Sequence, residues 1–383
     1  MAEMTERVVA EAFPPGEFIK EELQERGWTQ QDLADILGRD TATISALVTG
    51  RKPIGPEIAQ DLAAAFGTSA EYWMNLENSY RLLRDKKDGS EVARRAKLYG
   101  KAPIKEMIRR NWIEGSNNID VLEKQVCDFF EIGSLAEEPS FAHAARKSSS
   151  YKEISPTFKA WLSRARKLAR AVHVARRFSD RSLSEALESL RSLLANAEDV
   201  RQVPRVLADA GIRFVILEHL PQTRIDGACL WLDEHSPVVA ISLRYDRLDW
   251  FWHTVIHELG HVKNRDGLND AVPLDVDLVG DQAVPFSEKP QREKDADTFA
   301  AEFLVRQSEL NNFIARVKPL FSRVKIKGFA ARMHVHPAIV VGQLQFRKAI
   351  PYSHSRETLV KVRDLLTASA LTDGWGQTLP AIA

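Results

Sequence analysis

Two histidines four residues apart, in the stretch His257-Glu258-Leu259-Gly260-His261, constrain this chain more than any other feature. Residues at this spacing lie one above the other on a helix, so both imidazoles can bind one metal ion. The neighbouring apolar residues predict a buried helix face: Phe251, Trp252, Val255, Ile256, Leu259 and Val262. On its own the pattern also fits an ordinary helix, but it is typical of zinc hydrolases in which the glutamate is the general base.

A catalytic zinc ion needs a third protein ligand, and an acidic helix further along the chain can supply it. Within residues 292–305, apolar residues recur at helical spacing, and Glu293 stands one turn before Asp297. We expect Glu293 to bind the metal and Asp297 to accept the free N–H of a ligand histidine. A surface helix with ordinary acidic residues is the alternative. The two segments together predict a Zn²⁺ site formed by His257, His261 and Glu293, with Glu258 as the catalytic base.

The pattern His257-Glu258-x-x-His261 followed by Glu293-x-x-Ala296-Asp297-x-Phe299-Ala300 resembles the ImmA/IrrE family of zinc metallo-endopeptidases. The resemblance covers residues 200–350. It implies that the two histidines and Glu293 bind zinc and that Glu258 activates a water molecule. It also implies a protein partner, because members of this family cut a repressor or regulate it, but it does not identify the target.

Three further histidines are candidates for roles near the metal. Acyl transfer usually requires an electrophile that stabilises the oxyanion, and His334 and His336 are candidates for it. Two histidines in a turn between helices is the more ordinary interpretation. His253 lies one turn before His257, and we interpret it as structural.

The other end of the chain predicts two short helices joined by a tight turn. Thr29 and Asp32 form a capping box, Gly38 ends the first helix, and Asp40 caps a second helix over residues 41–48. Such a pair is a helix-turn-helix, which apolar residues lock together: Leu33, Ala34, Leu37, Ile44 and Leu47.

Residues 16–83 resemble the XRE/HigA-type antitoxin domain, mainly through Thr29-Gln30-x-x-Leu33-Ala34 and Gly50-x-x-Pro53-Ile54. A helical hairpin with no DNA role is the alternative. If the domain binds a double-stranded DNA operator, the residues facing base edges are Thr41, Ala42, Thr43 and Ala46. The residues suited to phosphates are Gln30, Arg39, Arg51 and Lys52. Helix-turn-helix proteins usually read two half-sites, which predicts a homodimer.

The charges are unevenly distributed along a chain that is neutral overall, with 53 basic and 53 acidic residues. Residues 16–80 hold five basic and eleven acidic residues, a net charge of −6 that is unfavourable for binding phosphates. Residues 81–110 hold eleven basic against four acidic residues, and residues 146–177 hold ten against one. These two segments form either a surface for nucleic acid or an acidic partner, or a solvated basic face packed on acidic neighbours.

A chain of 383 residues is expected to form two or three domains. The expected fold class is α+β and mostly helical, with a small antiparallel sheet packed against the metal-binding helices. Three strands are expected, over residues 212–220, 228–232 and 238–243. We expect a five-helix DNA-binding domain (16–83), a helical linker or regulatory region (84–200), a peptidase domain (201–350) and a C-terminal helix and tail (351–383). Residues 264–290, between the two metal-binding segments, are expected to form a loop that serves as a lid or a cleft wall.

No apolar run approaches the length of about twenty residues that a membrane helix needs, and Cys127 and Cys229 are isolated. These features predict a cytoplasmic protein. Two functions remain open: a DNA-binding transcriptional regulator with a working zinc endopeptidase that cuts or controls a partner repressor or toxin, or a HigA-like antitoxin or repressor whose peptidase fold only senses or binds a partner. A sensor of an acidic metabolite is a third, weaker interpretation.

Overall fold

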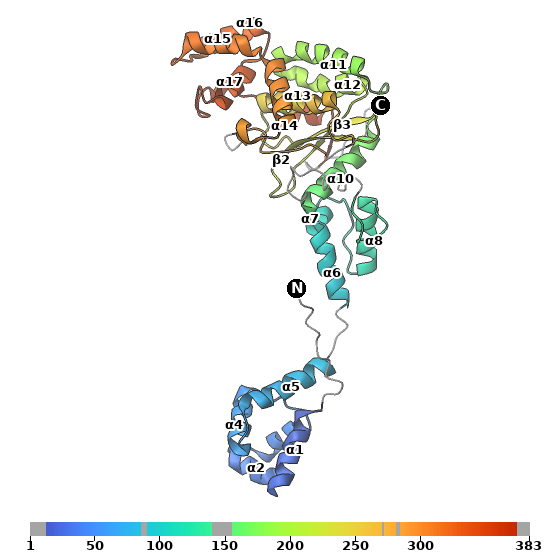
Figure 1. The fold of residues 1–383 in the computed structure, drawn as a ribbon, viewed down its shortest axis with the longest axis vertical. Helices are drawn as coiled ribbons and strands as arrows, with labels where there is room; N and C mark the ends of the chain where they lie inside the picture. The colour runs from blue at the N-terminus through green and yellow to red at the C-terminus, as the bar shows by residue number, and fades with distance from the viewer. Residues whose placement is uncertain (1–12, 86–89, 140–154, 270–271, 281–283, 374–383) are drawn as a thin grey trace. The chain divides into compact units, whose positions relative to one another are not determined.

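The computed structural model describes residues 13–85, 90–139, 155–269, 272–280 and 284–373 (Figure 1). The chain divides into two compact units, Met1–Glu91 and Val92–Ala383. Each unit is described separately below.

The first unit is a bundle of five helices, as predicted. They are α1 (Pro15–Arg26), α2 (Gln30–Leu37), α3 (Thr41–Val48), α4 (Pro56–Phe66) and α5 (Ala70–Arg84). The predicted capping box is present, because the Thr29 hydroxyl accepts from the Asp32 amide and Asp32 accepts from the Thr29 amide. Gly38 ends α2 at φ 62°, and the Asp40 side chain caps α3. The turn between α2 and α3 therefore has the geometry of a helix-turn-helix.

A single apolar core holds these five helices together. Its fully or almost fully buried members include Ile19, Leu33, Ala34, Ile44, Leu47, Leu62 and Trp73. Gly16 lets α1 approach the end of α3, since a Cβ atom there would lie 2.1 Å from the carbonyl oxygen of Val48. The apolar residues that were predicted to hold α2 and α3 together are thus part of the core of the whole first unit.

The second unit is mostly helical. Its helices are α6 (Ser90–Lys101), α7 (Ile104–Arg109), α8 (Ile119–Phe130), α10 (Pro156–Ala171), α11 (Asp180–Ser192), α12 (Val203–Asp209), α13 (Leu248–Asn264), α14 (Gln291–Leu304), α15 (Gln307–Val317), α16 (Arg323–Met333), α17 (Pro337–Phe346) and α18 (Arg363–Thr367). Short 3-10 helices cover Leu193–Ala195, Ala197–Gln202, Phe286–Glu288 and Arg356–Thr358. Helices and one small sheet in the same unit confirm the predicted α+β class.

The sheet has five strands and is mixed, which corrects the prediction of a small antiparallel sheet. The strands are β1 (Arg213–Leu217), β2 (Ile225–Trp231), β3 (Pro237–Ile241), β4 (Leu274–Val276) and β5 (Leu371–Asp373), in the order β4-β2-β3-β1-β5. β2 pairs antiparallel with β3 and β4, whereas β1 pairs parallel with β3 and β5. The hairpin of β2 and β3 places β3 beside β1, so these two strands run in the same direction. β4 lies within the expected loop, and β5 lies in the expected tail.

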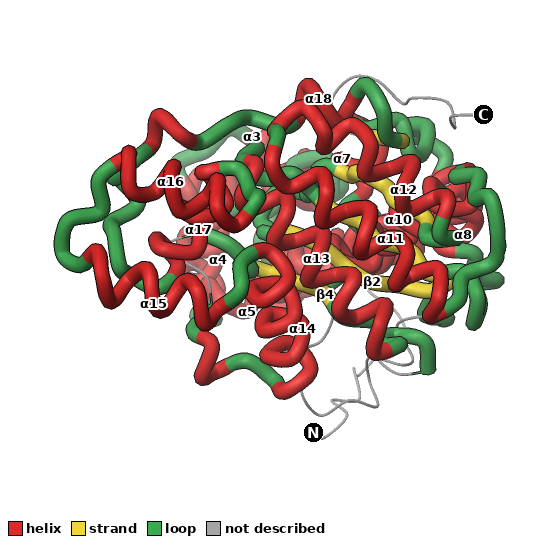
Figure 2. The backbone as a smooth tube through the Cα atoms, turned by 90° about the horizontal axis from the view of Figure 1, so that it is seen from above, coloured by secondary structure: helices red, strands yellow, loops and turns green. Residues whose placement is uncertain are grey.

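Side chains alternate between two apolar layers along the central strands. Phe214, Ile216, Val239 and Ile241 face the layer that contains α13, and Figure 2 shows α11, α12 and α13 lying over the strands. Val215, Leu217, Val238 and Ala240 face the layer that contains α10 and α8. Because the sheet is covered on both faces, its central strands read as nearly continuous apolar runs. The sheet thereby forms a rigid surface against which α13 packs.

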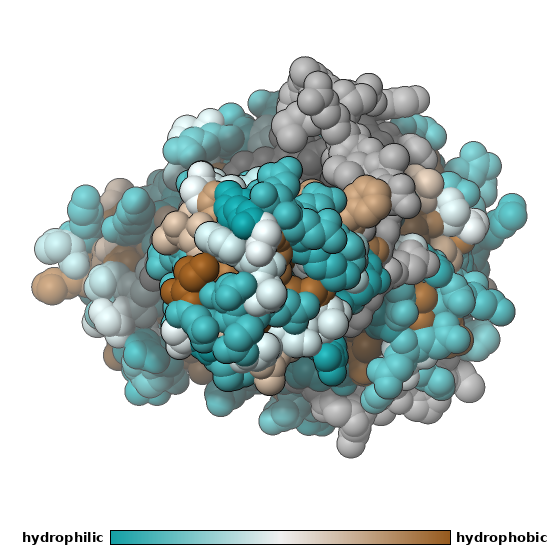
Figure 3. Space-filling model, turned by 90° about the horizontal axis from the view of Figure 1, so that it is seen from below, coloured by the Kyte–Doolittle hydropathy of each residue, from teal (hydrophilic) through white to brown (hydrophobic). Residues whose placement is uncertain are grey.

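Among the described residues, no helix has both the length and the apolar character needed to cross a membrane. On the face drawn in Figure 3, hydrophilic residues predominate and the apolar ones gather in small patches.

Candidate metal centre

Helix α13 carries both histidines of the central motif on its buried side. His257 and His261 are fully buried, and their Nε2 atoms lie 3.1 Å apart. The four-residue spacing has therefore brought the two imidazoles together, as expected for neighbours on one helix face.

Glu293 reaches the same point from α14. Its Oε2 atom lies 3.2 Å from Nε2 of His257 and 3.2 Å from Nε2 of His261. The close approach of the two helices depends on Gly260, because a Cβ atom there would lie 3.2 Å from the Cα atom of Ala296. The residues His257, His261 and Glu293, predicted from the sequence as metal ligands, thus converge in space.

Asp275, on the edge strand β4, is a fourth member of this cluster that was not predicted from the sequence. Its Oδ1 atom lies 3.4 Å from Nε2 of His257, and its Oδ2 atom lies 3.9 Å from Nε2 of His261. The donor atoms of His257, His261, Asp275 and Glu293 all lie within 4.8 Å of one another, and all four residues are buried. No sequence pattern identifies Asp275, because a three-residue strand is too short to show a clear periodicity.

Each of the two histidines has a carboxylate behind it. Nδ1 of His257 lies 2.9 Å from Oδ1 of Asp297, the residue predicted for this position. Nδ1 of His261 lies 2.8 Å from Oδ2 of Asp266, which sequence reasoning missed. Lys289 donates to the other oxygen of Asp297 over 2.6 Å. Carboxylates in these positions fix the ring orientation and leave each Nε2 atom facing the cluster.

Glu258 is fully buried beside Asp275, between α13 and strand β2. Its carboxylate fits only because residue 227 is glycine: a Cβ atom at Gly227 would lie 2.1 Å from Oε1 of Glu258. Burial raises the pKa of Glu258 well above its usual value, and the nearby carboxylates of Asp275 and Glu293 raise it further. A carboxyl group held in this way is suited to accept and release a proton.

Attraction between the imidazoles and the carboxylates dominates the ionisation of the cluster. Burial lowers the pKa of His257, but the carboxylates of Asp275, Asp297 and Glu293 outweigh this effect and hold the pKa well above its usual value. Burial opposes ionisation of Glu293, yet hydrogen bonds from both histidines hold the pKa of Glu293 far below its usual range. The same carboxylates that favour positive charge on the imidazoles would also stabilise a cation bound between them.

The donor set fits a divalent metal ion. Zinc bonds to nitrogen and oxygen are about 2.0–2.1 Å long, so the donors of a tetrahedral site lie about 3.3 Å apart. The observed separations of 3.1, 3.2, 3.2 and 3.4 Å match this spacing. Both oxygens of Glu258 and Oδ2 of Asp275 are buried without a well-formed hydrogen bond, although the two carboxyl groups lie against each other. Buried polar atoms of this kind indicate a site for a cation.

The three other candidate histidines lie outside the cluster formed by His257, His261, Asp275 and Glu293. His253 contacts Asp297, with Nε2 and Oδ1 3.6 Å apart, so it belongs to the support of the site. His336 caps α17 by accepting from the Ala338 amide, and His334 ends α16 in a left-handed conformation. Both therefore have the structural role of residues in a turn between helices.

The residues predicted to face DNA lie on and around α3. Thr41 and Ala42 are exposed, whereas Thr43 and Ala46 are half-buried. The hydroxyl of Thr41 donates to Gln31, and that of Thr43 donates to Asp40. Among the predicted phosphate contacts, Arg51 and Lys52 are exposed after α3, and Gln30 is half-buried at the start of α2.

Arg39, also predicted as a phosphate contact, takes part in an internal ion-pair network. Its guanidinium donates to Asp61 over 3.1 and 2.6 Å and to Glu57 over 2.9 Å. These hydrogen bonds join the α2–α3 turn to α4. A DNA phosphate would have to compete with both carboxylates for Arg39.

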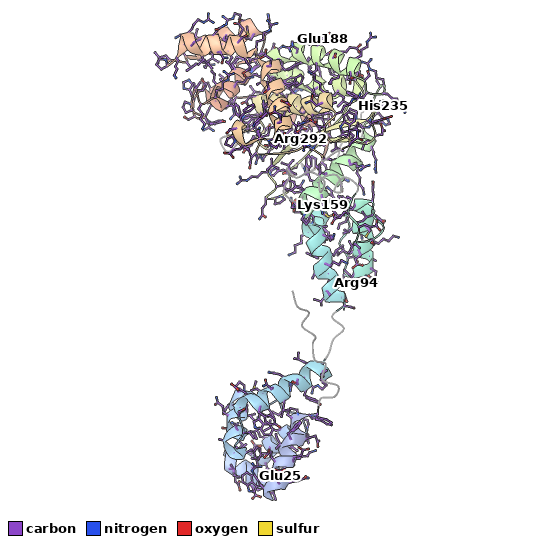
Figure 4. The ribbon with its side chains drawn as sticks, viewed as in Figure 1. Glu25, Arg94, Lys159, Glu188, His235 and Arg292 are labelled. Carbon is purple, nitrogen blue, oxygen red and sulfur yellow. The ribbon has the colours of Figure 1, made fainter. Side chains whose placement is uncertain are left out.

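Many charges of the two basic segments are also paired within the second unit. Arg94 contacts Asp120 and Glu123 on α8, and Lys159 contacts Glu138; Figure 4 labels both basic residues. Further pairs in these segments are Lys101–Glu138, Arg110–Glu106, Arg164–Asp373 and Arg170–Glu131. These contacts favour the interpretation that the basic segments pack against acidic neighbours.

The described residues thus form a five-helix unit with a helix-turn-helix and a second unit in which α13 and α14 enclose a buried cluster of His, Asp and Glu side chains. Residues 19–73 match the helix-turn-helix family model, and residues 208–334 match the peptidase family M78 model, described as an IrrE N-terminal-like domain. The N-terminal part is 33% identical over 73 residues to the HTH-type transcriptional regulator YddM of Escherichia coli K12, which covers 19% of this chain and 78% of that protein. The chain therefore belongs to the helix-turn-helix transcription regulators and carries an IrrE-like peptidase-family domain.

Solved structures similar to this chain match its N-terminal part. An addiction module antidote protein of the HigA family from Coxiella burnetii is 31% identical, covering 20% of this chain and 90% of that one, with a TM-score of 0.19. The antitoxin GraA is 27% identical, covering 21% and 88%, with a TM-score of 0.20. An antidote protein of a plasmid maintenance system from Nostoc punctiforme is 29% identical, covering 21% and 94%, with a TM-score of 0.19.

Proposed function

We propose that this protein is a DNA-binding transcriptional regulator whose second unit is a zinc-dependent endopeptidase that cuts or controls a partner repressor or toxin. The observation that carries the proposal is the convergence of His257, His261 and Glu293 on one point, with Glu258 beside it. The match to an IrrE-like peptidase family agrees with this arrangement.

The residues of the proposed metal site have different roles in peptide hydrolysis. When bound there, Zn²⁺ supplies a Lewis acid that lowers the pKa of a bound water and polarises the scissile carbonyl. Glu258 takes the proton of the attacking water and passes it to the leaving amine. Asp297 and Asp266 hold the two imidazoles in the orientation that leaves Nε2 for the metal.

A cavity next to the site suits an apolar side chain of the substrate. Its volume is about 240 Å³, and its walls include Trp250, Leu278, Ile339 and Phe346. His253 and Asp297 also line it, so the cavity and the metal cluster share a wall. An apolar substrate residue bound here would place the adjoining peptide bond near the ligands.

The first unit supplies the DNA-binding part of the proposal. Thr41 and Ala42 at the start of α3 are exposed and small, which suits contacts with thymine methyl groups or single hydroxyl hydrogen bonds. Arg51 and Lys52 follow the same helix and suit phosphates. A homodimer would present two such helices to the two halves of an operator.

Metal content and cleavage test the enzymatic proposal together. The purified full-length chain should hold about one zinc per chain, and His257→Ala should lose most of it. Glu258→Gln should keep the zinc but abolish cleavage of a mixed peptide library that the wild type cuts. A wild type that binds no zinc would overturn the metal assignment, and unchanged cleavage by Glu258→Gln would overturn the mechanism.

A second candidate function is favoured by Asp275. Four protein ligands around zinc are typical of structural sites, whereas catalytic sites keep one position open. The peptidase fold of an antitoxin or repressor would then bind a partner without cutting it. Zinc binding without cleavage, in the wild type and after removal of the Asp275 carboxylate, is the result that distinguishes this function.

A further inference from the structure

We propose that Asp275 is a fourth protein ligand that closes the metal centre in its resting state, and that β4 must withdraw before the peptidase can act. This inference rests on the proposed metal site but concerns its regulation. Asp275 lies outside the two sequence motifs that contain His257, His261 and Glu293. The segment between these two motifs then acts as a built-in inhibitor.

The distances support direct coordination. Oδ1 of Asp275 lies 3.4 Å from Nε2 of His257, close to the spacing of about 3.3 Å expected between donors of one tetrahedral zinc ion. The three separations among the other donors are 3.1–3.2 Å. Asp275 therefore lies where the fourth donor belongs and not in a more distant supporting layer.

The position of Asp275 relative to Glu258 explains why this ligand would inhibit. A general base must reach the water that it deprotonates by a hydrogen bond. The Asp275 carboxyl group lies against Glu258 and also against the two histidines. Its oxygens thus occupy the space between the base and the other ligands, which the attacking water needs.

The backbone holds Asp275 in this place through a small number of interactions. Asp275 is paired with Gly227 of β2, and β4 has three residues. Directly after it, Asp277 contacts Arg244 over 3.0 Å, and the Leu278 amide donates to Asp226 over 2.7 Å. Arg244 also binds Asp226, so one buried cluster anchors the end of β4 to β2.

Opening the site requires an exchange of ligands and no redox change. The Asp275 oxygen leaves, and the oxygen of a water molecule takes its place next to Glu258. A partner protein or a substrate strand that binds β4 more tightly than β2 does would drive this exchange. A short edge strand is a suitable element for such a movement, because few backbone hydrogen bonds must break.

Binding of a small zinc chelator to the zinc-loaded full-length protein tests this proposal without relying on cleavage. Acetohydroxamate binds where a metal has an open position, so calorimetry should show at least about tenfold tighter binding to Asp275→Ala than to the wild type. Asp295→Ala, an exposed aspartate on α14, is the matched control and should bind like the wild type. Asp275→Asn is a second variant that preserves the shape of the side chain.

The coordination of the wild type gives an independent measurement. X-ray absorption of the zinc-loaded wild type should show four nitrogen and oxygen donors from the protein, with a water replacing one of them in Asp275→Asn. Equal acetohydroxamate affinity in the wild type and both Asp275 variants would overturn the closure. Absence of zinc from the wild type would instead overturn the proposed metal site, so the two failures are distinguishable.

Discussion

Nδ1 of His257 lies 2.9 Å from Oδ1 of Asp297, one turn after Glu293 on α14. One helix thus supplies both a proposed ligand and the carboxylate next to another proposed ligand on α13. Asp266 holds His261 in the same way, from the residues that follow α13. The proposed metal centre therefore has two layers, and its outer layer consists of carboxylates.

Replacing Asp297 by asparagine should weaken zinc binding about 10- to 100-fold, because a neutral amide makes His257 a poorer ligand. The measurement is a competition titration of the purified protein against a fluorescent zinc chelator. Asp295→Asn, on the exposed side of α14, provides the control. Equal zinc affinity in both variants would show that Asp297 does not support the metal.

Gly227→Ala should disturb Glu258 directly. The added methyl carbon would lie 2.1 Å from Oε1 of Glu258 and 3.0 Å from Cγ2 of Thr254, so the strand or the carboxylate must move. We expect the free energy of unfolding to fall by about 1–3 kcal/mol and any peptide cleavage to be lost. Denaturant unfolding measures the first effect. Gly100→Ala, where no heavy atom lies within 4 Å of the new Cβ atom, should not destabilise the protein.

Glu138 joins two helices and should make stability depend on acid pH. It lies 2.8 Å from Nζ of Lys101 on α6 and 2.5 Å from Nζ of Lys159 on α10. Burial tends to raise the pKa of Glu138, but the two ammonium groups outweigh this effect and lower the pKa to about 2. The ordinary value is 4.5, so the contribution to stability is complete above pH 4.5 and is lost as the pH falls toward 2.

Glu138→Gln should therefore lower the free energy of unfolding by about 1–2 kcal/mol at pH 7 and much less at pH 2. Denaturant titrations between pH 7 and pH 2 measure the difference from the wild type. Glu188→Gln, at an exposed position of α11 that is labelled in Figure 4, controls for loss of a surface carboxylate. A difference between Glu138→Gln and the wild type that does not change with pH would contradict this assignment.

The DNA contacts can be separated by their salt dependence. Arg51→Ala combined with Lys52→Ala should reduce the slope of log K against log salt by up to about 2 on duplex DNA, because each lost phosphate contact removes about 0.9. Arg39→Ala should leave the slope nearly unchanged but reduce stability, because Arg39 is bound to Asp61 and Glu57. If Arg39→Ala flattens the slope as much as the double variant does, Arg39 contacts phosphate despite its internal partners.

The residues of the proposed metal site that lie within helices could be predicted from the sequence, but those outside helices could not. His257, His261, Glu293 and Asp297 follow from helical periodicity, which relates residues three or four positions apart. Asp275 and Asp266 come close through strand pairing and through the turn after α13, and neither relation has a period in the sequence. Asp275 therefore lies in a segment that the sequence predicted to be a loop.

The same limit applies to the sheet. The three predicted strands overlap β1, β2 and β3, because apolar runs mark strands covered on both faces. β5 joins the sheet from residues 371–373, where the sequence predicted a tail, and it pairs parallel with β1. Long-range pairing of a three-residue strand leaves no local pattern to find.

The contacts of β5 also determine which truncated forms of this protein keep a covered sheet. Asp373 at its end accepts hydrogen bonds from Trp112, which follows α7, and from Arg164 on α10, so this strand is tied to residues that lie 261 and 209 positions earlier. A fragment limited to residues 201–350 would lose this strand and the α10 cover of the sheet, exposing Val215, Leu217 and Ala240 to water. An isolated catalytic fragment with those ends would aggregate, and the helical middle of the chain should be kept in any truncation series.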